Sequence, residues 1–192
     1  MVLKCWIDVC VMEGRPPDGW RPALVVVDVQ NKFYNITEGL RNSFDLSRDA
    51  LNVTINMFRE ADLPIVFVFF DGGGDCMSNC DNADSVIDGV DFRSGDTVVH
   101  KTSMNCFYGS DLSAKLTELG CDSIVLSGMV AHLCVLSTYF SAYDNGFEPY
   151  IASGTLAATE QDNVGRVEAI TITLDPAALR RKLASASNGR AV

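Results

Sequence analysis

The sequence predicts a single α/β domain of the Rossmann-like, three-layer type, with helices on both faces of a mainly parallel central sheet. Two observations lead to this class: short β-branched runs alternate with longer amphipathic segments, and 47% of the 192 residues are hydrophobic. A chain of this length buries one substantial core. We therefore expect one domain over residues 1–192, with its core from about 21 to 184.

Five segments have the composition of strands that are buried on both faces of a sheet. Each is short and almost uniformly apolar or β-branched, as the strands of a parallel sheet are. The expected strands are Ala23–Val29, Ile65–Phe70, Thr97–His100, Ser123–Ser127 and Pro149–Ala152.

Helical patterns mark three segments between or after these strands. Apolar residues recur every three or four positions in Ser47–Ala61, which ends shortly before a proline. The same spacing recurs in Ser110–Leu119, which opens on a Ser-Asp cap and is closed by Gly120. A last helix is expected from the cap at Asp175, which a proline follows, to about Leu183.

Two segments fit this pattern less well. Leu3–Cys10 alternates in character and is a candidate for an added edge strand. Asp71–Gly95 is rich in glycine and aspartate and is predicted to be a long loop, either a functional lid or a surface excursion.

Charge and cysteine content narrow the function classes. A formal net charge of −10 repels nucleic-acid phosphates and anionic membranes, so we expect neither as a partner. No apolar run approaches the roughly 18 residues of a membrane helix, and Asp8 falls inside what would be the apolar core of a signal peptide. Seven scattered cysteines indicate reduced thiols, so we expect a cytoplasmic location.

Three reactive residues lie at the ends of predicted strands or shortly after them. Ligands of parallel α/β sheets bind beyond the carboxyl ends of the strands, so Asp28, Lys101 and Cys134 are the candidates for chemistry. Taken singly, each residue also suits a purely structural role. Asp28 could cap a turn, Lys101 could be a solvated lysine, and Cys134 could be a packed core thiol. The other six cysteines are predicted to be core thiols.

Cys134 falls in the opening turn of a helix that is rich in small and apolar residues. The exposed N–H groups and the dipole of a helix favour a thiolate at that place, and a neighbouring lysine strengthens the effect. We therefore expect a lowered pKa for the Cys134 thiol.

The residues around these three positions resemble the signatures of the isochorismatase-like cysteine hydrolases. The segments are Val-Val-Asp-Val-Gln-Asn-Lys-Phe with Asp28, His-Lys-Thr-Ser-Met-Asn-Cys-Phe-Tyr-Gly-Ser-Asp-Leu with Lys101, and Ser-Gly-Met-Val-Ala-His-Leu-Cys-Val with Cys134. Their order and spacing agree with that family. The resemblance covers roughly Arg21–Ala157 and includes a helix over Thr138–Gly146.

The resemblance implies a mechanism for the three residues. Asp28 takes the thiol proton, the Cys134 thiolate attacks a substrate carbonyl, and Lys101 supports both negative groups. Backbone N–H groups around Val130 and Cys134 would form the oxyanion hole, shaped by a cis peptide bond between Met129 and Val130. The candidate pocket residues are Phe33, Phe107 and His132, and the two phenylalanines also suit an ordinary core.

A metal centre is not expected. The nicotinamidase branch of the family holds a divalent metal with an aspartate and several histidines between the Asp and Lys signatures. This chain has only His100 and His132, and neither lies in that interval. Cys76 and Cys80, four positions apart, are a weak zinc signal without a second pair. We predict no metal and no cofactor.

The reaction stays open at this point. Retention of Cys134 favours hydrolysis of a C–N bond of a small molecule. Ala131–His132 instead resembles the isochorismatase version, in which the aspartate acts as an acid on a vinyl ether and no thiol is required. A binding protein that keeps the fold is the third alternative. Family members form dimers or tetramers, so we expect a homo-oligomer.

Overall fold

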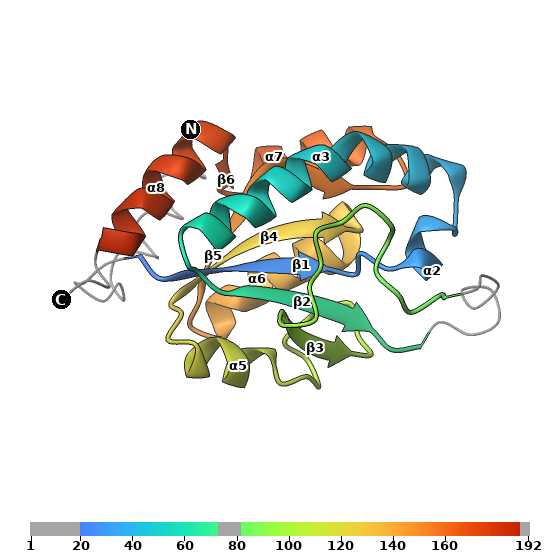
Figure 1. Ribbon diagram of the computed structural model, residues 1–192. Helices are drawn as coiled ribbons and strands as arrows, with labels where there is room; N and C mark the ends of the chain where they lie inside the picture. Colours follow the sequence, from blue (N-terminus) through green and yellow to red (C-terminus); the bar gives the residue numbers. More distant parts are fainter. Residues whose placement is uncertain (1–19, 73–81, 189–192) are drawn as a thin grey trace.

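The apolar runs of the sequence form the central sheet of the protein. The computed structural model describes residues 20–72 and 82–188. Within these residues six strands form one sheet in the order β3-β2-β1-β4-β5-β6, and every pairing is parallel (Figure 1). The strands are β1 (Pro22–Val27), β2 (Ile65–Phe70), β3 (Thr97–Lys101), β4 (Ser123–Met129), β5 (Glu148–Ala157) and β6 (Thr173–Leu174).

Helices cover both faces of this sheet (Figure 1). Helices α3 and α8 contribute to the core on one face, and α5, α6 and α7 contribute to the core on the other. The α/β class with helices on both sides of a parallel sheet is therefore confirmed. The helices are α2 (Asn31–Tyr34), α3 (Glu38–Glu60), α5 (Leu112–Glu118), the π-helical turn η1 (Ala131–Val135), α6 (Leu136–Asp144), α7 (Asp162–Ile170) and α8 (Pro176–Asn188).

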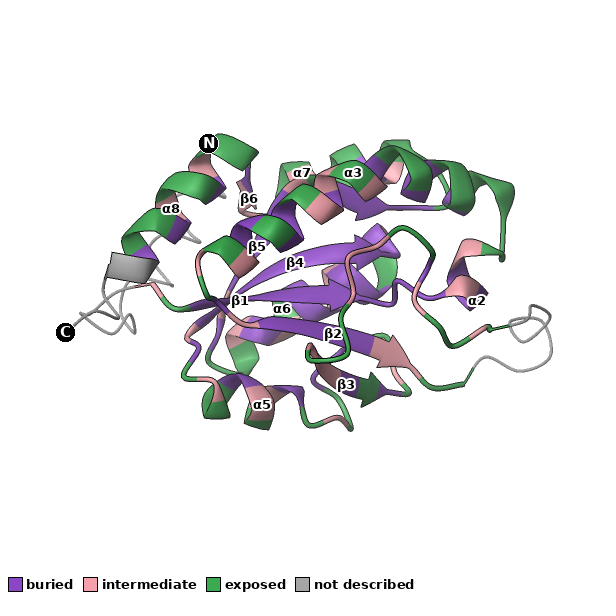
Figure 2. Cartoon of the chain, in the orientation of Figure 1, coloured by how far each residue is buried: buried purple, intermediate pink, exposed green. Residues whose placement is uncertain are grey.

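Strand β1 lies inside the sheet and is buried along its whole length (Figure 2). Successive side chains of a strand point to opposite faces. Leu24 and Val26 accordingly belong to the core beneath α3, whereas Val25 and Val27 belong to the core beneath α5 and α6. Both faces of β1 are apolar, which explains why its sequence carries no alternation of polar and apolar residues.

Several elements differ from the predictions. Helix α3 begins at Glu38 rather than Ser47, because the Thr37 hydroxyl caps it by accepting the Leu40 N–H at 3.1 Å. Leu40 and Phe44 then continue the buried stripe. Strand β5 runs on to Ala157, and the short elements α2, α7 and β6 were not predicted because they carry little periodic signal.

The described part of the predicted 71–95 loop packs on the body of the domain. Val86 pairs with Gln30 in an isolated antiparallel bridge, and Ile87 is buried. The ring of Phe92 meets that of Phe67 at 4.9 Å between centroids. Residues 82–95 are therefore anchored and do not form a free surface excursion. The proposed edge strand Leu3–Cys10 lies outside the described residues, as do residues 73–81.

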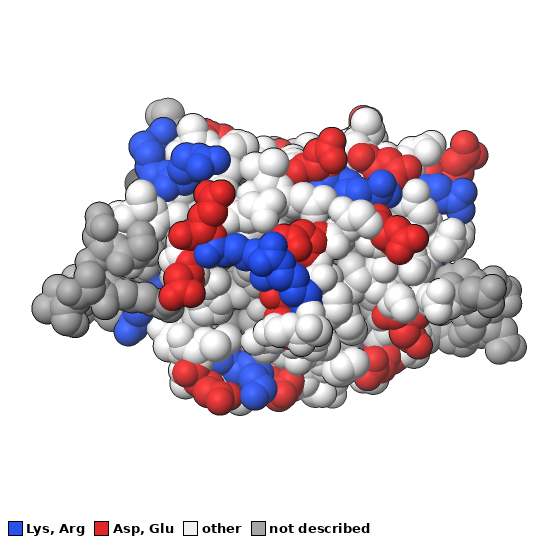
Figure 3. Space-filling view, viewed as in Figure 1, with Lys and Arg blue, Asp and Glu red and all other residues white. Residues whose placement is uncertain are grey.

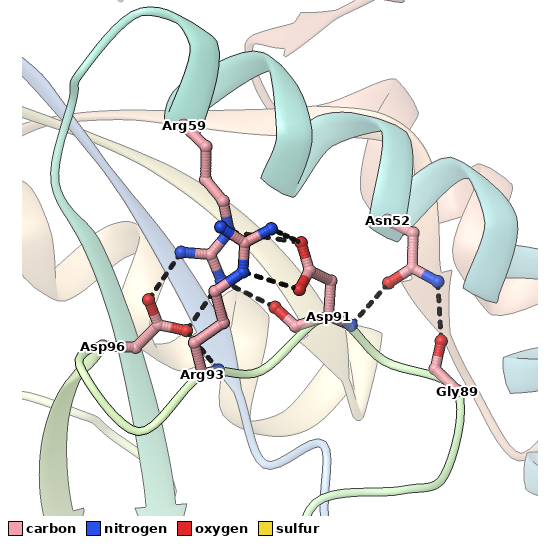
Figure 4. Close-up of polar contacts among 6 residues, drawn as sticks. All are labelled: Asn52, Arg59, Gly89, Asp91, Arg93 and Asp96. Carbon is pink, nitrogen blue, oxygen red and sulfur yellow. Dashed lines mark hydrogen bonds and ion pairs between the residues drawn. The ribbon is translucent and has the colours of Figure 1, made fainter.

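A cluster of charged side chains ties this loop to α3 (Figure 4). Arg59 Nη1 donates to Asp96 Oδ1 at 2.7 Å, and Arg59 Nη2 donates to the Asp91 carbonyl at 2.7 Å. Arg93 adds two hydrogen bonds to the Asp91 carboxylate, and Asn52 Nδ2 donates to the Gly89 carbonyl at 2.7 Å. This cluster lies at the amino end of β3, away from the strand ends that carry the candidate site.

Acidic and basic side chains are interspersed on this side of the molecule, and neither sign dominates it (Figure 3). Among residues 20–72 and 82–188, no helix is both long and apolar enough to span a membrane.

Candidate active site

The three predicted reactive residues come together at the carboxyl ends of the parallel strands. Asp28 follows β1 directly, Lys101 is the last residue of β3, and Cys134 lies in η1, just after β4. Asp28 has a φ of 53°, a left-handed conformation that is uncommon for a residue with a side chain. Such outliers concentrate at functional sites.

Asp28 and Lys101 form a fully buried ion pair. Lys101 Nζ donates to Asp28 Oδ2 at 2.7 Å, and neither side chain has exposed surface. The ammonium also donates to the Met104 carbonyl at 3.3 Å. The second carboxylate oxygen, Asp28 Oδ1, is buried and has no hydrogen-bond partner among the described residues. This oxygen is therefore free to accept a proton.

The electrostatics of the pair differ from those of a surface salt bridge. Burial raises the pKa of Asp28 above its ordinary value, although Lys101, the Cys134 thiol and Lys32 act in the opposite direction. Burial by itself lowers the pKa of Lys101, but Cys106, Asp28 and Cys134 together outweigh it and raise that pKa. Lys101 thus stays an ammonium, while Asp28 is more basic than a carboxylate in water.

The prediction of a lowered pKa for Cys134 is wrong. Burial raises the pKa of this thiol to about 12, and the negative charge of Asp28 adds to the increase, which Lys101 only partly offsets. The residue is only 6% exposed, so the loss of hydration outweighs the benefit expected at a helix start. Cys134 is consequently a thiol at neutral pH and needs a base before it can act as a nucleophile.

The backbone before Cys134 has the conformation that the resemblance implied. The Met129–Val130 peptide bond is cis, and Val130 immediately precedes η1. Both residues are buried. Their part in an oxyanion hole stays a prediction.

The candidate pocket residues Phe33, Phe107 and His132 belong to different parts of the structure. Phe33 belongs to the core beneath α3, where its ring meets Phe70 edge-on at 5.8 Å. Phe107 belongs to the opposite core and stacks on Phe147. His132 lies in η1, and its buried Nδ1 has no hydrogen-bond partner among the described residues. Contact of these residues with a substrate remains a prediction, and the two phenylalanines have the packing of core residues.

Lys32 is a charged residue of this region that the sequence reasoning missed. Its side chain is 3% exposed, and its ammonium donates to Asp84 Oδ1 at 2.6 Å and to the Gly72 carbonyl at 3.2 Å. The ammonium groups of Lys32 and Lys101 lie 5.8 and 5.4 Å from the centroid of the same Phe70 ring. In the sequence, Lys32 has the character of an ordinary solvated lysine. Its burial near the site follows only from the structure.

No group of three or more His, Cys, Asp or Glu side chains in residues 20–72 and 82–188 has the arrangement of a metal site. His100 Nδ1 is instead bonded to Asp71 Oδ1 at 2.8 Å, at the surface. Cys76 and Cys80 lie outside the described residues. The described side chains therefore do not fit an imidazole-rich metal centre.

Comparison with known proteins gives a consistent result. The sequence model of the isochorismatase domain matches residues 22–170. An uncharacterized isochorismatase family protein of Bacillus subtilis is 28% identical over 142 residues, which are 71% of this chain and 78% of that protein.

Solved structures agree with the sequence match. The N-carbamoylsarcosine amidase of Thermoplasma acidophilum is 28% identical, with a TM-score of 0.62 over 80% of this chain and 95% of that one. An isochorismatase-like hydrolase of Alkaliphilus metalliredigens is 19% identical, with a TM-score of 0.74 over 85% and 97% of the two chains. The latter comparison shows a shared fold.

Proposed function

Because this chain belongs to the isochorismatase family, we propose that it is a cysteine hydrolase that cleaves an amide C–N bond of a small molecule. One observation carries the proposal. A buried carboxylate of raised pKa, Asp28, keeps one oxygen without a partner in the same site as a thiol whose pKa is about 12. A general base and a nucleophile that needs one are thus found together.

The first half of the proposed reaction forms a thioester. Asp28 takes the proton of Cys134, and the thiolate attacks the carbonyl carbon of the substrate amide. Backbone N–H groups of Val130 and Cys134 stabilise the oxyanion of the tetrahedral intermediate. Asp28 then gives its proton to the leaving nitrogen, and ammonia or an amine departs. Lys101 holds Asp28 in place and favours its ionised form throughout.

The second half of the reaction hydrolyses the thioester. Asp28, now ionised again, takes a proton from water, and the hydroxide equivalent attacks the thioester carbonyl. Collapse of the second tetrahedral intermediate releases the carboxylic acid, and the proton on Asp28 returns to the Cys134 sulfur. One water is consumed, and the enzyme returns to its starting state.

Isochorismate hydrolysis is the second candidate function. The raised pKa of Asp28 favours it, because a carboxyl group that retains its proton more readily can protonate a vinyl ether. The Ala131–His132 sequence resembles the isochorismatase version of the motif. In this reaction Asp28 would be the principal acid, and Cys134 would be dispensable.

The partners and location of the protein are part of the same proposal. We expect a small-molecule substrate, no nucleic acid or membrane partner, a homo-oligomer and a cytoplasmic location. The net charge of −10 supports the expectation of no nucleic-acid or membrane partner, and the face shown in Figure 3 carries no predominantly basic patch.

The test compares purified wild type, Cys134→Ala and Cys121→Ala without added metal, on isochorismate and a panel of small amides. Cys121 is a buried cysteine outside the site, so its variant controls for the loss of any thiol. Ammonia release that Cys134→Ala abolishes and Cys121→Ala retains supports the amidohydrolase. Isochorismate turnover that survives in Cys134→Ala supports the second function. A folded wild type that acts on no substrate contradicts both and favours a binding protein.

A further inference from the structure

We infer that Thr138 is a positioning residue, which holds the Cys134 turn in register with the loop that follows Lys101. The inference rests on the proposed function and adds a residue to it. Thr138 is the third residue of α6, after Leu136 and Ser137, and it has no exposed surface.

 The Thr138 hydroxyl contacts both segments of the site. Thr138 Oγ1 donates to the Cys134 carbonyl at 2.7 Å and accepts the Cys106 N–H at 3.0 Å. Cys106 is itself fully buried. One hydroxyl thus joins the turn of the nucleophile to a loop that comes from a different strand.

The loop that Thr138 holds is also attached to the ion pair. Lys101 Nζ donates to the Met104 carbonyl at 3.3 Å, two residues before Cys106. The loop after Lys101 is therefore held at Met104 by the Lys101 ammonium and at Cys106 by the Thr138 hydroxyl. Through this loop, the position of Cys134 depends on the position of the Asp28–Lys101 pair.

The proposed proton transfer from Cys134 to Asp28 depends on the alignment of these two side chains. A thiol with a pKa of about 12 must give its proton directly to Asp28, so the two groups have to reach hydrogen-bonding geometry in the reaction. Small displacements of a reacting group reduce the rate of the chemical step more than they weaken substrate binding. Loss of the hydroxyl should therefore lower kcat and leave KM unchanged.

The test compares Thr138→Val, which removes the hydroxyl at nearly constant shape, with Thr138→Ser, which retains it. Thr54→Val is the matched control, because Thr54 is also buried and its hydroxyl likewise donates to a carbonyl four residues earlier, that of Ala50 at 2.9 Å, but in α3. The measurements are kcat, KM, the pH profile, the melting temperature, and the alkylation rate of Cys134 by iodoacetamide at alkaline pH.

For Thr138→Val we expect kcat to fall by about 10²-fold at unchanged KM, without a shift of the acid limb of the pH profile. Alkylation should become faster, because the thiol is less confined. Thr138→Ser should keep most of kcat, and Thr54→Val should keep all of it. If Thr138→Val does not fold, Thr138→Ala replaces it.

A folded Thr138→Val or Thr138→Ala variant with wild-type kcat and alkylation rate would overturn the inference. The inference would also be overturned if the Thr54 and Thr138 variants lost kcat in the same proportion to their loss of melting temperature. Should wild type hydrolyse none of the substrates, the proposed function fails. The alkylation rates then still decide the inference, because they need no substrate.

Discussion

Gly128 lies so close to Val27 that a Cβ atom added to it would stand 2.3 Å from the Val27 carbonyl oxygen. The two residues are partners in the pairing of β1 and β4. Gly128 also has a φ of 103°, which residues with side chains rarely adopt. Asp28 follows Val27 directly, so this contact sets the strand spacing where the site begins.

Gly128→Ala should therefore lower both stability and activity. The free energy of unfolding should fall by about 3 kcal/mol, from overpacking and left-handed strain together. Gly146→Ala is the matched control, because its φ is 81° and no atom lies within 4 Å of an added Cβ. Strain alone should cost about 1 kcal/mol there. Denaturant unfolding measures both values, and equal losses would contradict the role of the contact.

The pH dependence of kcat/KM should report the ionisation of Asp28. Burial raises the pKa of Asp28 above 3.8, and the base acts in its ionised form, so kcat/KM should fall as the pH drops through that raised value. Lys32 lowers the same pKa. Lys32→Met should therefore move the acid limb to higher pH.

Asp84→Asn separates this charge effect from the loss of a contact. This variant breaks the ion pair between Lys32 and Asp84 but keeps the positive charge of Lys32, which is then no longer offset by the Asp84 carboxylate. The acid limb should therefore not move to higher pH. If both variants move the limb upward, Lys32 does not act on Asp28 through its charge.

Cys134 should react slowly with iodoacetamide in the free enzyme. Because its pKa is about 12, its alkylation at neutral pH should be at least about tenfold slower than that of glutathione. The rate should still be rising at about pH 10. Peptide mass spectrometry measures this rate, and a plateau below pH 8 would show instead that the site stabilises a thiolate.

Arg59→Met should destabilise the fold by about 2–3 kcal/mol. The variant leaves the Asp96 carboxylate, which is 6% exposed, without its principal cation. Arg93→Met is the control: its side chain is 59% exposed, so the loss should stay below about 1 kcal/mol. Thermal or denaturant unfolding of the two variants gives the comparison, and a larger loss for Arg93→Met would contradict it.

The same cluster should weaken in acid. The pKa of Asp91 is lowered, first by its hydrogen bond from Arg93 and also by Arg59. A lowered carboxylate pKa stabilises the fold above the unfolded value of 3.8, and this contribution is lost as the pH falls through the folded value. Unfolding measured at neutral and acid pH should therefore show a smaller effect of Arg59→Met in acid.

Strong local patterns made the fold predictable. Buried strands such as β1 are apolar on both faces, and the start of α8 carries the Asp175–Pro176 signal that was expected. The start of α3 was missed because its cap, Thr37, lies well before the clearest apolar spacing. Strand β6 has only two residues, Thr173 and Leu174, and its pairing with β5 is a tertiary contact that leaves no periodic signal.

Positions in the site were easier to predict than its electrostatics. Asp28, Lys101 and Cys134 stand at strand ends, which the sequence pattern locates directly. The pKa of Cys134 depends on burial and on the distance to Asp28, and both arise from residues that are remote in sequence. Lys32 and Thr138 were missed for the same reason, since their partners Asp84 and Cys106 are 52 and 32 residues away.

The Arg59 cluster has a consequence for a residue that it does not contact. Asp96 immediately precedes β3, and Lys101 ends that strand, opposite Phe70 of β2. Two strand spacings, about 10 Å, separate β3 from β1, so the lysine must extend past the end of β2 to meet Asp28. Inserting or deleting one residue between Asp96 and Lys101 would turn the ammonium to the other face of the sheet. The number of residues in that interval is therefore as necessary for the ion pair as the lysine itself.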